Sequence, residues 1–142
     1  MEKSGAESIQ SPAAQWLRYW FPVFAYITLI FYLSSLSHPE ERLPNFLFEQ
    51  LGDKLLHGIE YAVLAVLCYR AFRWAAGPQA GEYAVMLAVV STSLYGLTDE
   101  FHQAYVPLRE SSFADWIADT TGAVIGAVGS RRLLERGAKQ SI

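Results

Sequence analysis

Long apolar segments alternate with short polar ones along the chain, and four of the apolar segments are long enough to cross a bilayer as helices. They cover approximately residues 16–36, 55–74, 82–103 and 113–133. The first and the third are apolar on every side, whereas a helix of a soluble bundle keeps a polar face toward water. The pattern therefore predicts an all-α protein, a four-helix transmembrane bundle, in preference to a soluble four-helix bundle.

The polar segments set the predicted domain boundaries. We expect a disordered N-terminal tail at residues 1–12, the membrane domain at residues 13–133 and a C-terminal tail at residues 134–142. Residues 37–52 predict an outer loop, with a short amphipathic piece at 46–51, and Gly77-Pro78 predicts the turn between the second and third helices. A cleaved signal peptide is the alternative for the first helix, but its apolar run is longer than that of a signal peptide.

The basic residues predict the orientation of the bundle. Eight of the 11 Lys and Arg residues would lie on the same side as the termini, namely Lys3, Arg18, Arg70, Arg73, Arg131, Arg132, Arg136 and Lys139. The positive-inside rule places this side in the cytoplasm. We therefore expect both termini to be cytoplasmic and the loops after the first and third helices to face outward.

The amino-acid composition excludes some classes of function. Of the 142 residues, 52% are hydrophobic and 18% charged, and the formal net charge is −3. This mildly acidic balance excludes a general nucleic-acid binder, so the expected partner is the lipid bilayer and not nucleic acid. Cys68 is the single cysteine, which excludes an intrachain disulfide and a four-cysteine zinc site.

Polar residues, most of them ionisable, recur at helical spacing in three helices. In each helix they lie near the end that is expected to face outward. The three sets are Asp53, His57, Glu60 and Tyr61; then Tyr95, Asp99, His102 and Gln103, with Glu100 a quarter turn away; then Asp115 and Asp119. An ionised group in hydrocarbon costs about 2.5–3.5 kcal/mol, so such groups usually pair or line a wet cavity. The spacing predicts one polar site that is shared by three helices.

Structural roles remain open for some of these residues. Asp53 suits a helix N-terminus, Ser112 with Asp115 fits a capping box, Tyr61 and Tyr95 suit packing, and Arg109 and Glu110 suit a loop.

Small residues recur every fourth position in the fourth helix, at Ala118, Gly122, Gly126 and Ser130. Such a row lets two membrane helices approach closely. We expect the approach to bring Asp119 against His57 or His102.

Two stretches, DKLLHGIEYAVLAVL (53–67) and YGLTDEFHQAYVPLRESSFADWIADTTGAVIG (95–126), resemble the VanZ-like family of small bacterial integral membrane proteins. The resemblance covers about residues 16–130. The family's motif positions map to Asp53, Lys54, His57, Tyr61, Asp99, Glu100, His102, Gln103, Arg109, Ser112, Asp115 and Gly122. The chain departs from the family at Leu108, where members more often have Gly, and at Asp119, where they more often have Asn.

The resemblance implies a multi-pass protein of the bacterial inner membrane. The family takes its name from a member associated with resistance to the glycopeptide antibiotic teicoplanin, and a resistance role for this chain does not follow from that.

The first functional hypothesis is a membrane enzyme that acts on a lipid-linked or cell-envelope substrate at the outer leaflet. His57 or His102 would be the general base, and Asp53 or Asp99 would orient it, with Glu100 as a further catalytic candidate. Arg109 and Lys54 would hold an anionic group. Gln103, Tyr61, Asp115 and Asp119 complete the expected substrate site.

Two alternatives stay open. His57-x-x-Glu60 and Asp99-x-x-His102 resemble the inward ligand pairs of metal-binding helix bundles. A non-catalytic binding or interaction protein, in which the polar groups only tie helices together, fits as well. The sequence itself identifies no reaction, cofactor, metal or oligomeric state.

Overall fold

The computed structural model describes residues 11–37, 52–109 and 111–139. The helices in these ranges are α1 (Pro12–Ser34), α4 (Asp53–Ala75), α5 (Pro78–Glu82), α6 (Ala84–Gln103) and α7 (Phe113–Lys139). The described residues contain no strand, so the predicted all-α class is confirmed for them. Outside the described residues lie positions 1–10 of the predicted tail at 1–12, positions 38–51 of the predicted loop at 37–52 with its amphipathic piece, Glu110, and positions 140–142 of the predicted C-terminal tail.

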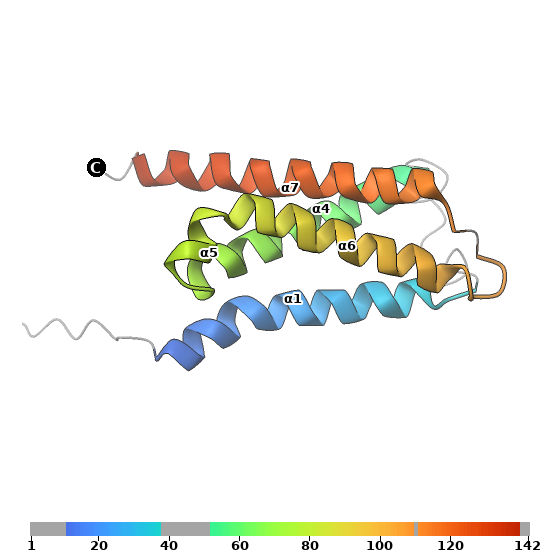
Figure 1. Ribbon diagram of the computed structural model, residues 1–142, viewed down its shortest axis with the longest axis horizontal. Coiled ribbons are helices and arrows are strands. Elements are labelled where there is room, and N and C mark those ends of the chain that lie inside the picture. Colours follow the sequence, from blue (N-terminus) through green and yellow to red (C-terminus); the bar gives the residue numbers. More distant parts are fainter. Residues whose placement is uncertain (1–10, 38–51, 110, 140–142) are drawn as a thin grey trace, which may run out of the picture.

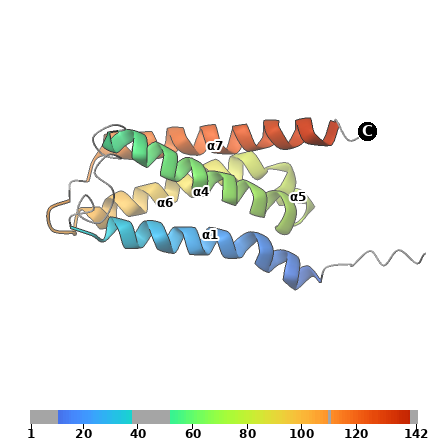
Figure 2. The same ribbon diagram turned by 180° about the vertical axis from the view of Figure 1, so that it is seen from behind.

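The four long helices lie lengthwise beside one another, with α4 as the central element (Figure 1). α4 packs most extensively against α7 and also against α6 and α1, whereas α1 touches α6 only slightly. The start of α1, α5 and the end of α7 lie at one end of the bundle, as the reverse view also shows (Figure 2). We call the opposite end, which holds Ser34, the start of α4, Gln103 and Phe113, the distal end.

Local sequence explains where the helices begin and end. Ser11 caps α1, because its Oγ accepts a hydrogen bond from the N–H of Ala14 at 3.2 Å, and Pro12 occupies the first helical position. α1 therefore begins earlier than the predicted residue 16. α5 was not predicted; it begins at Pro78, after Gly77 with its positive φ of 88°. α7 continues past the predicted residue 133 to Lys139, through a polar stretch rich in good helix formers.

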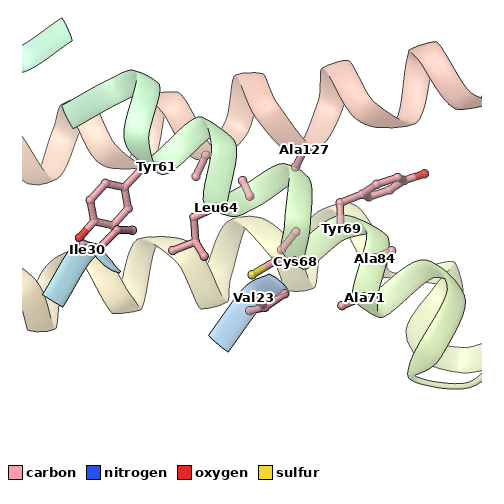
Figure 3. Close-up of a cluster of buried hydrophobic side chains, with 12 residues drawn as sticks. Val23, Ile30, Tyr61, Leu64, Cys68, Tyr69, Ala71, Ala84 and Ala127 are labelled. Atoms are coloured by element: carbon pink, nitrogen blue, oxygen red, sulfur yellow. The ribbon is translucent and has the colours of Figure 1, made fainter. Parts of the chain in front are cut away.

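The apolar core runs along the middle of the bundle, around the inner face of α4 (Figure 3). α4 contributes Tyr61, Leu64, Ala65, Cys68, Tyr69 and Ala71, and the other helices contribute Val23, Ile30, Ala84, Ala88, Ala123 and Ala127. The buried residues of α6 and α7 in this core are alanines, which permit short distances between helix axes.

Glycines bring α7 into backbone contact with α4. A Cβ added at Gly122 would lie 2.0 Å from the carbonyl oxygen of Gly58, and one added at Gly126 would lie 2.2 Å from that of Ala62. Real Cβ atoms do not approach that closely, so both positions require glycine in this packing. The close approach predicted from the row of small residues is confirmed.

Large apolar side chains cover the outside of the bundle. Phe21 in α1 is 63% exposed, Leu94 in α6 58% and Ile125 in α7 65%. Soluble monomers rarely expose large contiguous apolar patches. Among the described residues, Pro12–Ser34 and Lys54–Ala75 are long and apolar enough to cross a membrane by length and composition. α6 and α7 do not meet that criterion, so the predicted spans at these two helices stay predictions.

Candidate functional site

Buried polar side chains gather at the distal end of the bundle. Ser34 comes from α1, His57 from α4, Asp99, Glu100 and Gln103 from α6, and Asp115 and Asp119 from α7. Away from this end, the centre of the bundle holds the apolar core, with Thr92 and Ser130 as further buried polar residues. Buried ionisable residues of α4, α6 and α7 therefore lie at one end of the molecule, and α1 contributes to the same region.

A histidine and an aspartate form the centre of this region. His57 Nδ1 lies 3.0 Å from Asp119 Oδ1, and the two residues are 8% and 0% exposed. The expectation that Asp119 would meet a histidine is confirmed for His57. Of the two expected orienting residues, Asp99 bonds to Ser34 and Gln103, and the side chain of Asp53 lies outside the described residues.

Glycines on two helices make room for this pair. His57 directly precedes Gly58, whose carbonyl oxygen lies against Gly122, so α4 and α7 are in backbone contact beside the pair. On α6, a Cβ at Gly96 would lie 3.0 Å from Asp119 Oδ2. The absence of a side chain at Gly96 thus allows Asp119 to lie between α4 and α6. Gly96 was not singled out in the sequence, although its helical spacing from Glu100 was available as a signal.

Glu100 lies next to this pair. Its Oε2 accepts a hydrogen bond from the backbone N–H of Ser112 at 2.7 Å, and its Oε1 is buried without a hydrogen-bond partner. His57, Glu100 and Asp119 each offer one ligand atom, and these atoms lie within 4.8 Å of one another. We call these three residues the distal cluster. The metal pairs expected from the sequence were different, since Glu60 and His102 do not belong to this group.

Asp99 and His102 face α1 instead. Asp99 Oδ2 accepts hydrogen bonds from Ser34 Oγ at 2.8 Å and from Gln103 Nε2 at 2.9 Å. His102 Nε2 lies 3.0 Å from Ser35 Oγ, and its ring packs on Phe31. Sequence reasoning missed both serines, although they are the hydroxyl residues that end the first apolar segment. These bonds join α1 to α6.

Tyr61 and Glu60 of α4 and Tyr95 of α6 differ in their surroundings. Tyr95 donates its hydroxyl hydrogen to the carbonyl of Ile27 at 2.9 Å, which is a structural role. The hydroxyl of Tyr61 is buried and has no hydrogen-bond partner, although its ring packs beside that of Tyr95. Glu60 is half-buried on the same helix.

An ion pair lies at the edge of the site. Lys54 Nζ pairs with Asp115 Oδ1, and the lysine side chain is 59% exposed while that of the aspartate is 7% exposed. The capping box expected at the start of α7 is therefore incomplete. Ser112 Oγ does accept from the N–H of Ala114, but the N–H of Ser112 donates to Glu100 and not to Asp115.

The connection from α6 to α7 carries two further features. Arg109 is half-buried, and its Nε is buried without a hydrogen-bond partner. Leu108 has a φ of 66°, and no other non-glycine residue in the described part of the chain has a positive φ. Positive φ favours glycine, which agrees with the glycine that VanZ-like sequences more often have at this position.

Hydrogen bonds also hold α6 and α7 together beneath the distal cluster. Trp116 Nε1 donates to the carbonyl of Ser93 at 3.1 Å, and the hydroxyls of Ser93 and Thr120 lie 2.7 Å apart. These contacts fix the rotation of α7, and with it the direction in which Asp119 points.

Comparison with known proteins assigns the chain to a family. No curated protein and no solved structure matches it. The family model described as VanZ/LLP1 matches residues 4–134, which is most of the chain and includes every residue of the distal cluster. The resemblance noted in the sequence is thereby confirmed, and the chain belongs to the VanZ/LLP1 family.

Proposed function

We propose that this protein is a multi-pass protein of the bacterial inner membrane, and that its distal end faces outward and acts on a lipid-linked or cell-envelope substrate. Membership of the VanZ/LLP1 family and the two apolar helices support a membrane location. The large apolar side chains on the outer faces of α6 and α7 suit contact with lipid along these helices as well.

The orientation is supported by the position of the chain ends and by charge. The start of α1 and the end of α7 lie at the same end of the bundle, as an even number of spans requires (Figure 1). Arg70, Arg73, Arg131 and Arg132 lie near that end, in the last turns of α4 and α7. The positive-inside rule assigns such an end to the cytoplasm, so the distal end would face outward.

The buried His57–Asp119 contact carries the proposal for chemistry. Asp119 would accept the Nδ1–H of His57 and leave Nε2 as the base that removes a proton from water or from a substrate hydroxyl. A carboxylate in this position holds the imidazole in one tautomer and stabilises its protonated form. His57 is therefore the base that we favour over His102, which bonds to Ser35 at the α1 side.

A groove between α4 and α7 supports a lipid-linked substrate. It has a volume of about 310 Å³ and is lined mainly by apolar groups, including Leu55, Ile59, Ala62 and Ile125. Lys54, one turn before His57, lines the same groove. A hydrocarbon chain in the groove would place its anionic head group beside Lys54, with Arg109 as the second cation of the distal end.

The experiment is substrate conversion by the full-length protein in lipid nanodiscs. The protein is incubated with total envelope lipids, and the lipid-linked species are compared by mass spectrometry before and after. Replacing His57 with Gln is expected to slow the conversion by about 100-fold or more, the usual contribution of a general base. Glu82→Gln, a change at an exposed residue of α5, is expected to have no effect. Equal conversion by wild-type and His57→Gln protein would reject the proposal.

For Asp99 and His102, the observed bonds favour a second, structural function. Both residues bond to serines of α1 and so join α1 to the rest of the bundle. We assign to them the role of tying helices together, which the sequence left as an alternative for the whole set. Their replacement should lower stability and leave the chemistry at His57 in place.

A further inference from the structure

We propose that His57, Glu100 and Asp119 bind a divalent first-row transition-metal ion such as Zn²⁺ or Mn²⁺. The three residues come from three helices, α4, α6 and α7, and are 8%, 5% and 0% exposed. Their ligand atoms lie within 4.8 Å of one another. Metal–ligand bonds of about 2.0–2.2 Å place donor atoms about 3.4 Å apart around a tetrahedral ion, so a small closure of side chains completes the site.

The two carboxylates each keep one oxygen for a further partner. Asp119 Oδ1 contacts His57, and Asp119 Oδ2 is buried without a hydrogen-bond partner. Glu100 Oε2 accepts from the N–H of Ser112, and Glu100 Oε1 is buried without a partner. A buried carboxylate oxygen without a partner is costly. A cation bound to both oxygens removes this cost and balances the two negative charges.

The donor set selects the class of ion. Mg²⁺ and Ca²⁺ are bound mainly by oxygen atoms, whereas one imidazole with two carboxylates suits zinc, manganese or iron. Three protein ligands leave at least one coordination position for water or substrate, which is the pattern of catalytic and not of structural zinc sites.

The surroundings hold the ligands in place, as outer contacts do in metal sites. The backbone of Ser112 fixes Glu100, and Gly96 allows Asp119 to lie between α4 and α6. In the metal-bound protein His57 would be a ligand and not the general base, and the ion would activate a water molecule beside the substrate instead; this role of the ion rests on the proposed function. Binding of the ion does not, and binding alone is therefore measured.

The test uses the purified full-length protein in detergent, stripped with a chelator and titrated with ZnCl₂ or MnCl₂. We expect about one ion per chain by elemental analysis, and a rise in the unfolding temperature because the ion joins three helices. Asp119→Asn, Glu100→Gln and His57→Gln are each expected to weaken binding by at least about 10-fold. Glu82→Gln, at the other end of the bundle, is the matched control and should bind as wild type does.

A spectroscopic measurement on the wild-type protein keeps the proposal testable if a variant fails to fold. Mn²⁺ bound at the site should show nitrogen hyperfine coupling from an imidazole in pulsed electron paramagnetic resonance. Absence of this coupling, absence of tight binding, or equal binding by all three folded variants would overturn the proposal. If the ion binds and the protein converts no envelope lipid, the metal site stands and the proposed function fails.

Discussion

The backbone of Gly122 in α7 lies directly against the carbonyl oxygen of Gly58 in α4, so that a Cβ at position 122 would be 2.0 Å from that oxygen. On each helix the contacting glycine is close in sequence to a residue of the distal cluster. His57 directly precedes Gly58 in α4, and Asp119 lies one turn before Gly122 in α7. The distance between the two helices at this point therefore determines whether His57 and Asp119 meet.

Gly122→Ala should separate α4 from α7 and destabilise the protein. The added methyl group meets backbone, which cannot rotate away, so we expect a loss of about 3 kcal/mol, the upper part of the range for overpacking. Unfolding in mixed micelles measures it. Gly129→Ala is the matched control, because nothing lies within 4 Å of its Cβ; it should stabilise the helix by up to about 1 kcal/mol. Equal stability of the two variants would contradict the packing.

Leu108→Gly should stabilise the protein. The residue has a φ of 66° and is 74% exposed, so glycine relieves the backbone strain and removes few side-chain contacts. Left-handed backbone costs a non-glycine residue about 1–2 kcal/mol, and glycine's extra freedom in the unfolded chain offsets about 0.4–1 kcal/mol of that gain. We expect a net gain of roughly 0.5–1 kcal/mol. Leu108→Ala keeps the strain, so a gain as large in that variant would rule out this explanation.

Ser34→Ala should loosen α1 from α6. It removes the hydroxyl that donates to Asp99 Oδ2 at 2.8 Å in a buried position. Hydrogen bonds between membrane helices contribute about 0.6–1.7 kcal/mol, and we expect the loss to lie in this range. A double-mutant cycle with Asp99→Ala isolates the pair. A coupling energy near zero would show that the bond does not hold the two helices together.

The C-terminus should lie in the cytoplasm. Green fluorescent protein fused after residue 142 is expected to fluoresce in cells, and alkaline phosphatase fused there to be inactive, because the phosphatase folds only outside the cytoplasm. A phosphatase fusion after Tyr105, at the distal end, should be active and serves as the control. The opposite pattern would invert the proposed orientation and place the distal cluster on the cytoplasmic side.

The sequence was sufficient for the helices and for the gathering of polar residues, because both follow from periodicity along single helices. The sequence was not sufficient to predict which side chains those polar residues would contact. Asp99 and Glu100 are neighbours in the chain and lie about 100° apart around α6. Since α6 lies between α1 and α7, Asp99 bonds to Ser34 of α1 and Glu100 to the start of α7. Spacing gives the angle between two side chains, but the neighbour that each one meets depends on the packing of the whole bundle.

Two local differences have the same kind of cause. α5 is a single short helix after Gly77, and it was treated as part of the turn because five residues carry no periodic pattern. Leucine disfavours a positive φ, so the residue type at position 108 gave no sign of one. The signal was that VanZ-like sequences more often have glycine at this position.

The central position of α4 has a consequence for how the protein is made. Its most extensive partner is α7, which follows it in the chain and is therefore made after it. During synthesis His57 therefore cannot contact Asp119 until α7 has been translated. A nascent chain that stops before residue 113 contains His57 but lacks Asp115 and Asp119, so the distal cluster can form only after α7 has been made.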